Sequence, residues 1–311
     1  MKSDPLVSVL MSVYKEGVPI VSQAIDSIRK QSYQNIEIIV LLDCPGYEEL
    51  TAYLAQLERE ESRLHYCVNE VNMGLLASLN KGLDLCRGEF ICRMDADDYA
   101  ERDLIAKQMD YIHAHKLDLV GSYTNLMNVN GELPGTIKHF PIHHKYLCRY
   151  LKYANAVPHP TWLVRKVVYD TLHGYRNVLY AEDYDFLIRA CLSDYRMGVV
   201  PEPLLRYRVN QKGITQRNMA SQKIVSSCLA AQLKKNKIFS EEEIIIYREK
   251  RKHAETGLTK YYTAGKKWKM GEQLSLTDKC MVIFNVQNLK ELWERLSCKW
   301  ILYRDGKYDH Y

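Results

Sequence analysis

The segment Phe90-Ile91-Cys92-Arg93-Met94-Asp95-Ala96-Asp97-Asp98 places three carboxylates directly after an apolar strand. In an open α/β sheet, ligands bind beyond the carboxyl ends of the strands, which is where this acidic turn would lie. Side chains alternate along an extended chain, so Asp95 and Asp97 are expected on one side, where they can hold a hard cation such as Mg²⁺ or Mn²⁺. The alternative is an acidic turn in which Asp98 caps the next helix.

Outward from this strand, the first 120 residues or so alternate strands and helices at βαβ spacing. We predict strands over 6–13, 36–42, 64–68 and 90–94, and helices over 20–30, 47–60 and 75–85. This rhythm predicts a parallel sheet covered on both faces. The middle is less regular, with helices over 105–115 and 183–191 and short strands over 119–123 and 162–165. From Ile214 the pattern is helical, and Ser240 with Glu243 forms a predicted capping box.

The composition is that of an ordinary globular protein, with 47% hydrophobic and 26% charged residues among 311. The net charge of +5 is unevenly spread: 22 of the 43 Lys and Arg but only 11 of the 38 Asp and Glu lie from Arg206 onward. A basic tail can bind nucleic acid or an anionic membrane, or can simply be solvated helix faces. Because the tail lacks clustered aromatic stacking platforms, we expect no nucleic-acid partner.

Nine cysteines are present, and no two form a CxxC pair. Most fall in apolar segments, so we expect reduced, packed thiols. We identify no apolar leader and no stretch of about 18 apolar residues that could span a membrane. We therefore expect a cytoplasmic protein, located at the inner face of the membrane if the tail docks there.

Three further motifs each have a chemical and a structural interpretation. Asp43 ends the strand 36–42 and could bind a base or ribose, or simply close a βα turn. Gly74, between Asn72 and Asn80, would let a helix N-terminus approach phosphate, although a plain turn explains it as well. Glu182 and Asp183 open a helix, where acids complement the dipole or one of them serves as a general base.

Together these motifs resemble glycosyltransferase family 2, whose members have the GT-A fold and transfer a sugar with inversion of its anomeric configuration. The resemblance rests on Pro5 to Tyr14, Ile36 to Asp43, Asn72-x-Gly74 with Asn80-x-Gly82, Asp95-Ala96-Asp97, His159-Pro160, Glu182-Asp183 and Tyr207-Arg208. It covers about two thirds of the chain. Only Asp43 stands where the family usually has two acids, and Asn210 stands where many relatives have a histidine.

The resemblance implies a Rossmann-like mixed sheet and a role for each matched residue. Asp183 is the implied catalytic base, Asp95 and Asp97 the implied metal ligands, and His159 and Glu182 lie on the acceptor side. The implied nucleotide-sugar contacts are Ser12, Tyr14, Glu16, Asp43, Asn72, Gly74, Asn80, Asp95, Ala96 and Arg208. The expected reaction moves a sugar, with Mn²⁺ or Mg²⁺, from a UDP-sugar to a hydroxyl of a glycan or a polyprenyl-diphosphate-linked glycan. The expected setting is bacterial surface polysaccharide assembly.

We expect a catalytic domain over 1–213, with a nucleotide-sugar half at 1–100 and an acceptor half at 101–213, followed by a helical region at 214–311. In that tail, Leu289, Leu292, Trp293, Leu296 and Trp300 fall on one helical stripe near basic residues. The stripe could dock on an anionic membrane, but we favour its packing on the catalytic domain. Two other functions remain open: a nucleotidyltransferase that releases pyrophosphate, and a degenerate transferase kept as a partner subunit.

Overall fold

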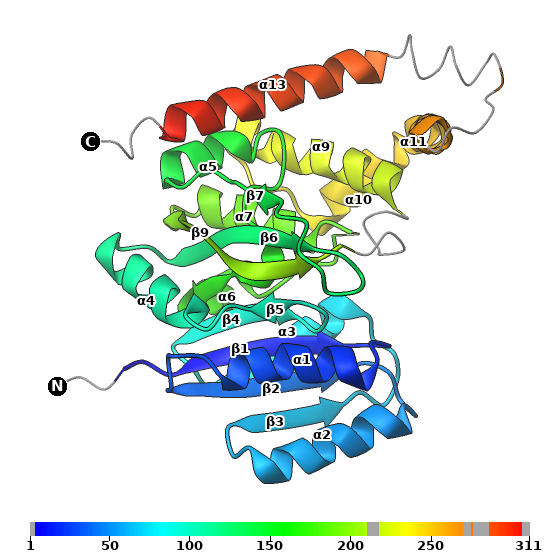
Figure 1. Cartoon of the computed structure of the whole chain (residues 1–311). Helices are drawn as coiled ribbons and strands as arrows, with labels where there is room; N and C mark the ends of the chain where they lie inside the picture. The colour runs from blue at the N-terminus through cyan, green and yellow to red at the C-terminus, as the bar shows by residue number, and fades with distance from the viewer. Residues whose placement is uncertain (1–3, 179, 210–217, 270–274, 276–285, 307–311) are drawn as a thin grey trace.

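A single mixed sheet runs through the chain, in a computed structural model that describes residues 4–178, 180–209, 218–269, 275 and 286–306 (Figure 1). The strand order is β3-β2-β1-β4-β8-β6-β9-β5, and β7 pairs with β6. The strands are β1 (Val7–Val13), β2 (Ile36–Leu42), β3 (Leu64–Val68), β4 (Phe90–Asp95), β5 (Tyr99–Ala100), β6 (Leu119–Met127), β7 (Ile137–Lys138), β8 (Leu163–Arg165) and β9 (Met197–Arg208).

The first half of the sheet is parallel, as predicted. Strand β1 pairs in parallel with β2 and β4, and β2 pairs with β3. Every residue of β2 is buried, which is why all of its residues except Glu37 are apolar. In β4, Phe90, Cys92 and Met94 pack into one hydrophobic cluster and Ile91 into the other. Arg93 and Asp95 therefore project to the same face as Ile91.

Helices cover both faces of the sheet (Figure 1). Apolar residues of α1, α2 and α4 pack into one cluster with β1, β2 and β4. Those of α3, α5, α6, α7 and α9 form the second cluster, on the other face. The helices are α1 (Val18–Arg29), α2 (Glu48–Glu60), α3 (Leu75–Leu85), α4 (Leu104–Ala114), α5 (His144–Tyr150), α6 (Lys166–Leu172), α7 (Glu182–Leu192), α9 (Met219–Lys235), α10 (Glu241–Glu249), α11 (Lys252–Lys269) and α13 (Val286–Gly306), with a short 3₁₀ turn η1 (His159–Thr161).

The second half of the sheet mixes directions. Strand β8 is antiparallel to both β4 and β6, whereas β6 and β9 are parallel. Strand β9 was not predicted, because Pro201 and Pro203 interrupt its apolar periodicity. Its register against β6 shifts at these prolines. This strand delivers Tyr207 and Arg208 to the end of the sheet near Asp98, since the Arg208 backbone N–H donates to the Asp98 carboxylate at 2.8 Å.

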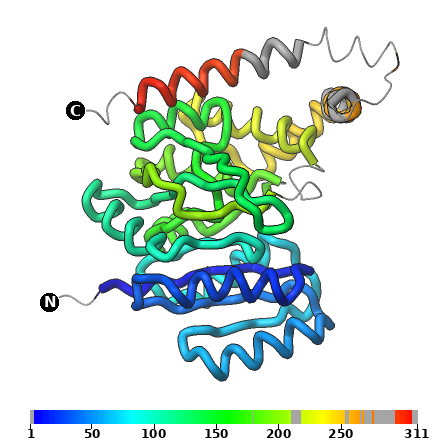
Figure 2. Tube along the Cα trace, in the orientation of Figure 1, coloured from blue at the N-terminus to red at the C-terminus, as the bar shows by residue number. Residues whose placement is uncertain are grey.

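The described part of the C-terminal region is helical, as expected, and lies over the α5 side of the sheet (Figures 1 and 2). The capping box at Ser240 and Glu243 is confirmed, with both reciprocal hydrogen bonds present. The expected boundary at residues 213 and 214 falls outside the described residues. None of the helices in the described ranges is long and apolar enough to cross a membrane.

The preferred interpretation of the tail stripe was wrong for the residues that can be checked. Trp293, Leu296 and Trp300 are 66%, 53% and 55% exposed and do not pack on the catalytic domain. Helix α13 contacts α5 through its other face, where Ile301 is buried. The side chains of Leu289 and Leu292 lie outside the described residues.

The expectation that all cysteines are free thiols was also wrong, because Cys148 on α5 and Cys191 on α7 form a disulfide. The two residues are 43 apart in sequence, and only the tertiary fold brings them together. Buried thiols are found as expected at Cys86, Cys92 and Cys228.

Candidate functional site

Several of the predicted nucleotide-sugar residues lie where β1, β2 and β4 end. The register pairs Ser12 with Asp95 and Val13 with Leu42, so the three strands finish side by side. The Asp43 N–H donates to the Val13 carbonyl at 2.8 Å, which extends this alignment past the strands. The loop after β1 turns back here, with the Tyr14 N–H donating to the Glu16 carboxylate at 2.7 Å. The carboxyl ends of these strands thus form one edge, as in other open α/β sheets.

The acidic turn after β4 is electrostatically crowded. Burial first, and then the charges of Asp95 and Glu16, raise the pKa of Asp97 to about 7. Asp95 is half-buried and forms an ion pair of 2.5 Å with Arg93 through Oδ1. Carboxylates forced together in this way bind protons or cations readily. The donor set is therefore suited to a hard divalent cation.

Among the described residues, no group of three or more His, Cys, Asp or Glu side chains is arranged to hold a metal ion. Asp95 and Asp97 are the predicted ligands, and Mg²⁺ held by one or two carboxylates usually takes its other ligands from phosphate and water.

Asp98 does not cap helix α4, so the alternative interpretation of the acidic turn is wrong for this residue. Its side chain is buried, and Oδ1 accepts the Arg208 N–H while Oδ2 has no partner among the described residues. Burial, and then the charges of Asp95 and Asp97, raise its pKa well above the ordinary value. The N-cap position of α4 is Asp103, whose side chain makes no capping bond.

Arg208 braces the acidic turn. Its Nε donates to the Asp97 carbonyl at 2.7 Å, Nη1 to the Val129 carbonyl at 3.0 Å and Nη2 to Gln23 at 3.0 Å. These hydrogen bonds hold the Asp97 backbone in position. If Arg208 also contacts the nucleotide sugar, as predicted, it must do so with the same N–H groups. Arg206, two residues earlier on β9, pairs instead with Glu101 at 2.6 Å.

Asp43 organises the loop that precedes α3. Its buried carboxylate accepts hydrogen bonds from Asn69 Nδ2, the Met73 N–H and the Gly74 N–H, at 2.7 to 2.8 Å. Gly74 is the N-cap of α3 and has a φ of +81°, a left-handed conformation that favours glycine. The Asn72 side chain accepts a further bond from the Gly74 N–H at 3.0 Å. Asp43 thereby fixes the N-terminus of α3, which the sequence resemblance implies as a contact of the nucleotide sugar.

Glu182 and Asp183 open α7, as predicted. The Asp183 carboxylate accepts the Tyr184 N–H and Asn155 Nδ2, each at 2.7 Å. Burial raises the pKa of Asp183, and these two donors and the Arg93 charge oppose the rise. Burial, and then the charge of Asp183, raise the pKa of Glu182 to about 7. The pair is thus poised to exchange a proton near neutral pH.

Arg93 links the acidic turn to this pair. The side chain is 3% exposed, and Nε and Nη1 have no hydrogen-bond partner among the described residues. Its positive charge lowers the pKa of Asp98, Glu182 and Asp183. A buried guanidinium at this point offsets the repulsion among carboxylates contributed by β4 and α7.

Two predicted residues point into the protein instead. Asn80 exchanges hydrogen bonds with the backbone of Tyr175, donating to its carbonyl at 2.8 Å and accepting its N–H at 2.9 Å. His159 is buried, and its Nε2 lies 2.7 Å from the Tyr175 hydroxyl. Burial, and then Arg93, hold the pKa of His159 well below its usual range, so the ring is neutral. Both side chains fix the segment beside α7.

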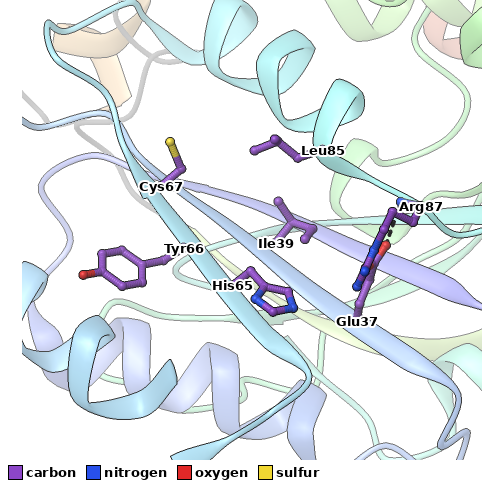
Figure 3. Close-up of a pocket in the computed structure, with 7 residues that line it drawn as sticks. All are labelled: Glu37, Ile39, His65, Tyr66, Cys67, Leu85 and Arg87. Atoms are coloured by element: carbon purple, nitrogen blue, oxygen red, sulfur yellow. Dashed lines mark hydrogen bonds and ion pairs between the residues drawn. The ribbon is translucent and has the colours of Figure 1, made fainter. Parts of the chain in front are cut away.

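A cavity of about 380 Å³ lies away from all of these residues, against β2, β3 and the end of α3 (Figure 3). Its polar feature is the ion pair between Glu37 and Arg87, at 2.7 Å. The lining residues are Glu37, Ile39, His65, Tyr66, Cys67, Leu85 and Arg87, and none was predicted to bind the nucleotide sugar.

Sequence reasoning gave no role to Arg93 or Asn155. Arg93 carried a usable signal, since a lone charge inside an apolar strand two residues before an acidic turn must find a partner when buried. Asn155 lies in an irregular segment, and no local pattern marks it. The aspartate next along α7, Asp185, is fully buried and bonds to Arg176 and Arg189, so it is a structural residue.

Residues 8–171 match the family Glycosyl transferase family 2, which is more than half of the chain. The chain belongs to this family. It is 30% identical over 235 residues to the O-antigen biosynthesis glycosyltransferase WbnJ of Escherichia coli, covering 75% of this chain and 91% of that one. It is 26% identical over 215 residues to an E. coli UDP-Gal:α-D-GlcNAc-diphosphoundecaprenol β-1,3-galactosyltransferase, covering 68% and 78%.

The GT-A fold is also clear from solved structures. The mannosyltransferase PcManGT of Pyrobaculum calidifontis, determined with GDP-Man and Mn²⁺, superimposes with a TM-score of 0.60 at 14% identity, covering 100% of this chain and 88% of that one. The family 2 transferase described here therefore has a mixed GT-A sheet followed by C-terminal helices, as the resemblance implied.

Proposed function

We propose that this transferase moves a sugar from a nucleotide sugar, a UDP-sugar in the first instance, to an acceptor hydroxyl with inversion. The observation that carries the proposal is the position of two acidic sites on one face of the sheet. The acidic turn after β4 and the Glu182–Asp183 pair on α7 are joined electrostatically through Arg93. One site suits the diphosphate and its cation, and the other suits a proton acceptor.

Asp183 is the proposed base. The acceptor oxygen forms a bond to the anomeric carbon while the bond from that carbon to the phosphate oxygen breaks. The electron pair leaves with the nucleoside diphosphate, and the acceptor proton passes to an Asp183 carboxylate oxygen. Asn155 and the Tyr184 N–H hold that carboxylate in place. A single displacement on one face requires one base and inverts the configuration.

The diphosphate end is held by the edge formed by β1, β2 and β4. Mn²⁺ or Mg²⁺, when bound by Asp95 and Asp97, would neutralise charge on the leaving group as a Lewis acid. Arg208 keeps the Asp97 backbone in position, and Asp43 keeps the α3 N-terminus aimed at the same edge. Backbone N–H groups at a helix N-terminus bind phosphate well.

The acceptor proposed is a glycan, or a glycan carried on a polyprenyl diphosphate, in surface polysaccharide assembly. Support comes from the names of two relatives, one in O-antigen biosynthesis and one acting on a diphosphoundecaprenol-linked sugar. The uridine of the donor is a proposal as well, because one similar protein is named for a UDP-sugar and another was determined with GDP-Man.

Nucleotide release from a panel of UDP-, GDP- and dTDP-sugars, with Mn²⁺ or EDTA, tests the proposal. Metal-dependent release of a nucleoside diphosphate from one donor, lost in Asp97→Ala but kept in the exposed control Asp84→Ala, is the expected result. Release of pyrophosphate would identify a nucleotidyltransferase instead. If titration with each nucleotide and metal detects no binding, the degenerate-subunit alternative replaces the proposal.

A further inference from the structure

Helix α13 has one face that is fixed to the catalytic region. Ile301 and Asp305 are 3% and 1% exposed. The Asp305 carboxylate accepts the backbone N–H of Ile142 and lies 2.7 Å from His143 Nδ1, at the start of α5. Glu294 forms an ion pair with Lys223 on α9. These contacts determine which face of the helix turns outward.

The outward face carries large apolar side chains. Trp293, Leu296, Trp300 and Tyr303 are between 53% and 66% exposed. Their spacing of three, four and three residues puts them on one stripe of the helix. Four large side chains gathered in this way differ from the scattered exposed residues found on most surfaces, and such patches mark interaction sites.

The described charged residues that flank the stripe are basic. Arg295, Lys299 and Arg304 are exposed, and Arg304 lies over the Trp300 ring, 5.5 Å from its centroid. The two acidic residues between Trp293 and Gly306 are Glu294 and Asp305, and both are engaged on the inward face. An apolar stripe rich in tryptophan and flanked, over residues 293–306, by exposed cations is typical of a helix that lies in a lipid interface.

We propose that the outward face of α13 docks the enzyme on an anionic membrane surface. The aromatic and leucine side chains would insert at the headgroup level, and the cations would pair with lipid phosphate. A second copy of the chain is a poorer occupant, because a two-fold pairing of this face would bring cations against cations.

Docking in this way would orient the enzyme. Helix α13 lies at the end of the molecule opposite β3 and α2 (Figure 1). The membrane would therefore lie on the side of the acceptor half, and the nucleotide-binding strands would face away from it. This orientation would place a lipid-linked acceptor close to the acceptor half, so its significance rests on the proposed function. The docking itself does not rest on the proposed function.

Co-sedimentation of the full-length protein with vesicles of phosphatidylcholine, with and without phosphatidylglycerol, tests the docking. We expect binding to the anionic vesicles that weakens as salt rises. Trp293→Ser/Leu296→Ser/Trp300→Ser should weaken partitioning by at least about tenfold. Lys299→Glu/Arg304→Glu should weaken it by about fivefold or more for each charge reversed. Exposed apolar residues on α3 and α6 provide the matched control, Leu85→Ser/Val167→Ser, which should bind as the wild type does.

Each other result has a definite meaning. No binding of the wild type at low salt overturns the proposal, as does equal binding by the wild type and the serine variant. Self-association that depends on the stripe, without vesicle binding, would make this face an interface between copies. Circular dichroism and donor hydrolysis of the variants separate docking from folding and from the proposed activity, since loss of docking should leave both unchanged.

Discussion

Arg93 and Asp95, two residues apart on β4, form an ion pair of 2.5 Å in which the arginine is almost completely buried. The two side chains share the face of the sheet that meets α7. The ion pair fixes one carboxylate oxygen of Asp95, a predicted metal ligand. The positive charge of Arg93 also lowers the pKa of Asp183, the proposed base. This single contact therefore couples the two halves of the site.

Replacing Arg93 with methionine should disrupt both halves. Removing one partner of a buried ion pair typically costs about 3 kcal/mol or more, because the carboxylates lose their compensating charge. We expect a lower melting temperature and at least about a hundredfold loss in kcat/KM. Arg93→Lys keeps the charge and should recover part of both. Unfolding curves and initial rates of both variants measure this, and a fully active Arg93→Met would contradict the role assigned to the pair.

The pH dependence of transfer should report the Glu182–Asp183 pair. Because burial and Asp183 raise the pKa of Glu182 to about 7, the pair still holds a proton below that pH. A base must be ionised to accept a proton, so at saturating metal the rate should rise with pH through about 7.

Substitution of each acid separates their roles. Glu182→Gln removes the partner that shares the proton, so its rate profile should shift to lower pH while activity is kept. Asp183→Asn should lose at least about a thousandfold in kcat. The reverse pattern, an active Asp183→Asn with an inactive Glu182→Gln, would make Glu182 the base.

Asp43→Asn tests whether the loop before α3 positions the nucleotide. The substitution replaces an acceptor with an amide that cannot satisfy Asn69 Nδ2 and two backbone N–H groups together. We expect a loss of about 1 to 3 kcal/mol in unfolding free energy and weaker donor binding. Calorimetric titration with the nucleotide measures the second effect. Unchanged affinity in a destabilised variant would restrict Asp43 to a structural role.

Asp305→Ala should loosen α13 from α5. Its carboxylate serves His143 and the backbone of Ile142, so truncation leaves buried donors unpaired at a cost of about 1 to 3 kcal/mol. Hydrogen exchange should accelerate in 293–306 and at the start of α5, and strands β1, β2 and β4 should remain protected. Uniform protection throughout would show that the anchor lies elsewhere on α13.

The sequence alone predicted the parallel half of the fold and most of its boundaries. The reason is local: strands buried on both faces are continuous apolar runs, and helices with one apolar face show a 3.6-residue period. The sequence also indicated the acidic turn after β4 and the acids that open α7. Each of these motifs directly follows or begins a regular element, so its position could be predicted. Family resemblance added their roles, because neither spacing nor composition distinguishes a base from a helix-terminal acid.

Tertiary structure decided which charges meet. Strand β8 inserts antiparallel between β4 and β6, a pairing that no short-range pattern encodes. The disulfide between Cys148 and Cys191 and the contact of Arg208 with Asp97 likewise join segments distant in sequence. On α13, periodicity identified an apolar stripe, but only the buried anchors Ile301 and Asp305 determined that it faces outward. A helical period specifies which residues share a face, whereas the neighbours that cover the opposite face determine where that face points.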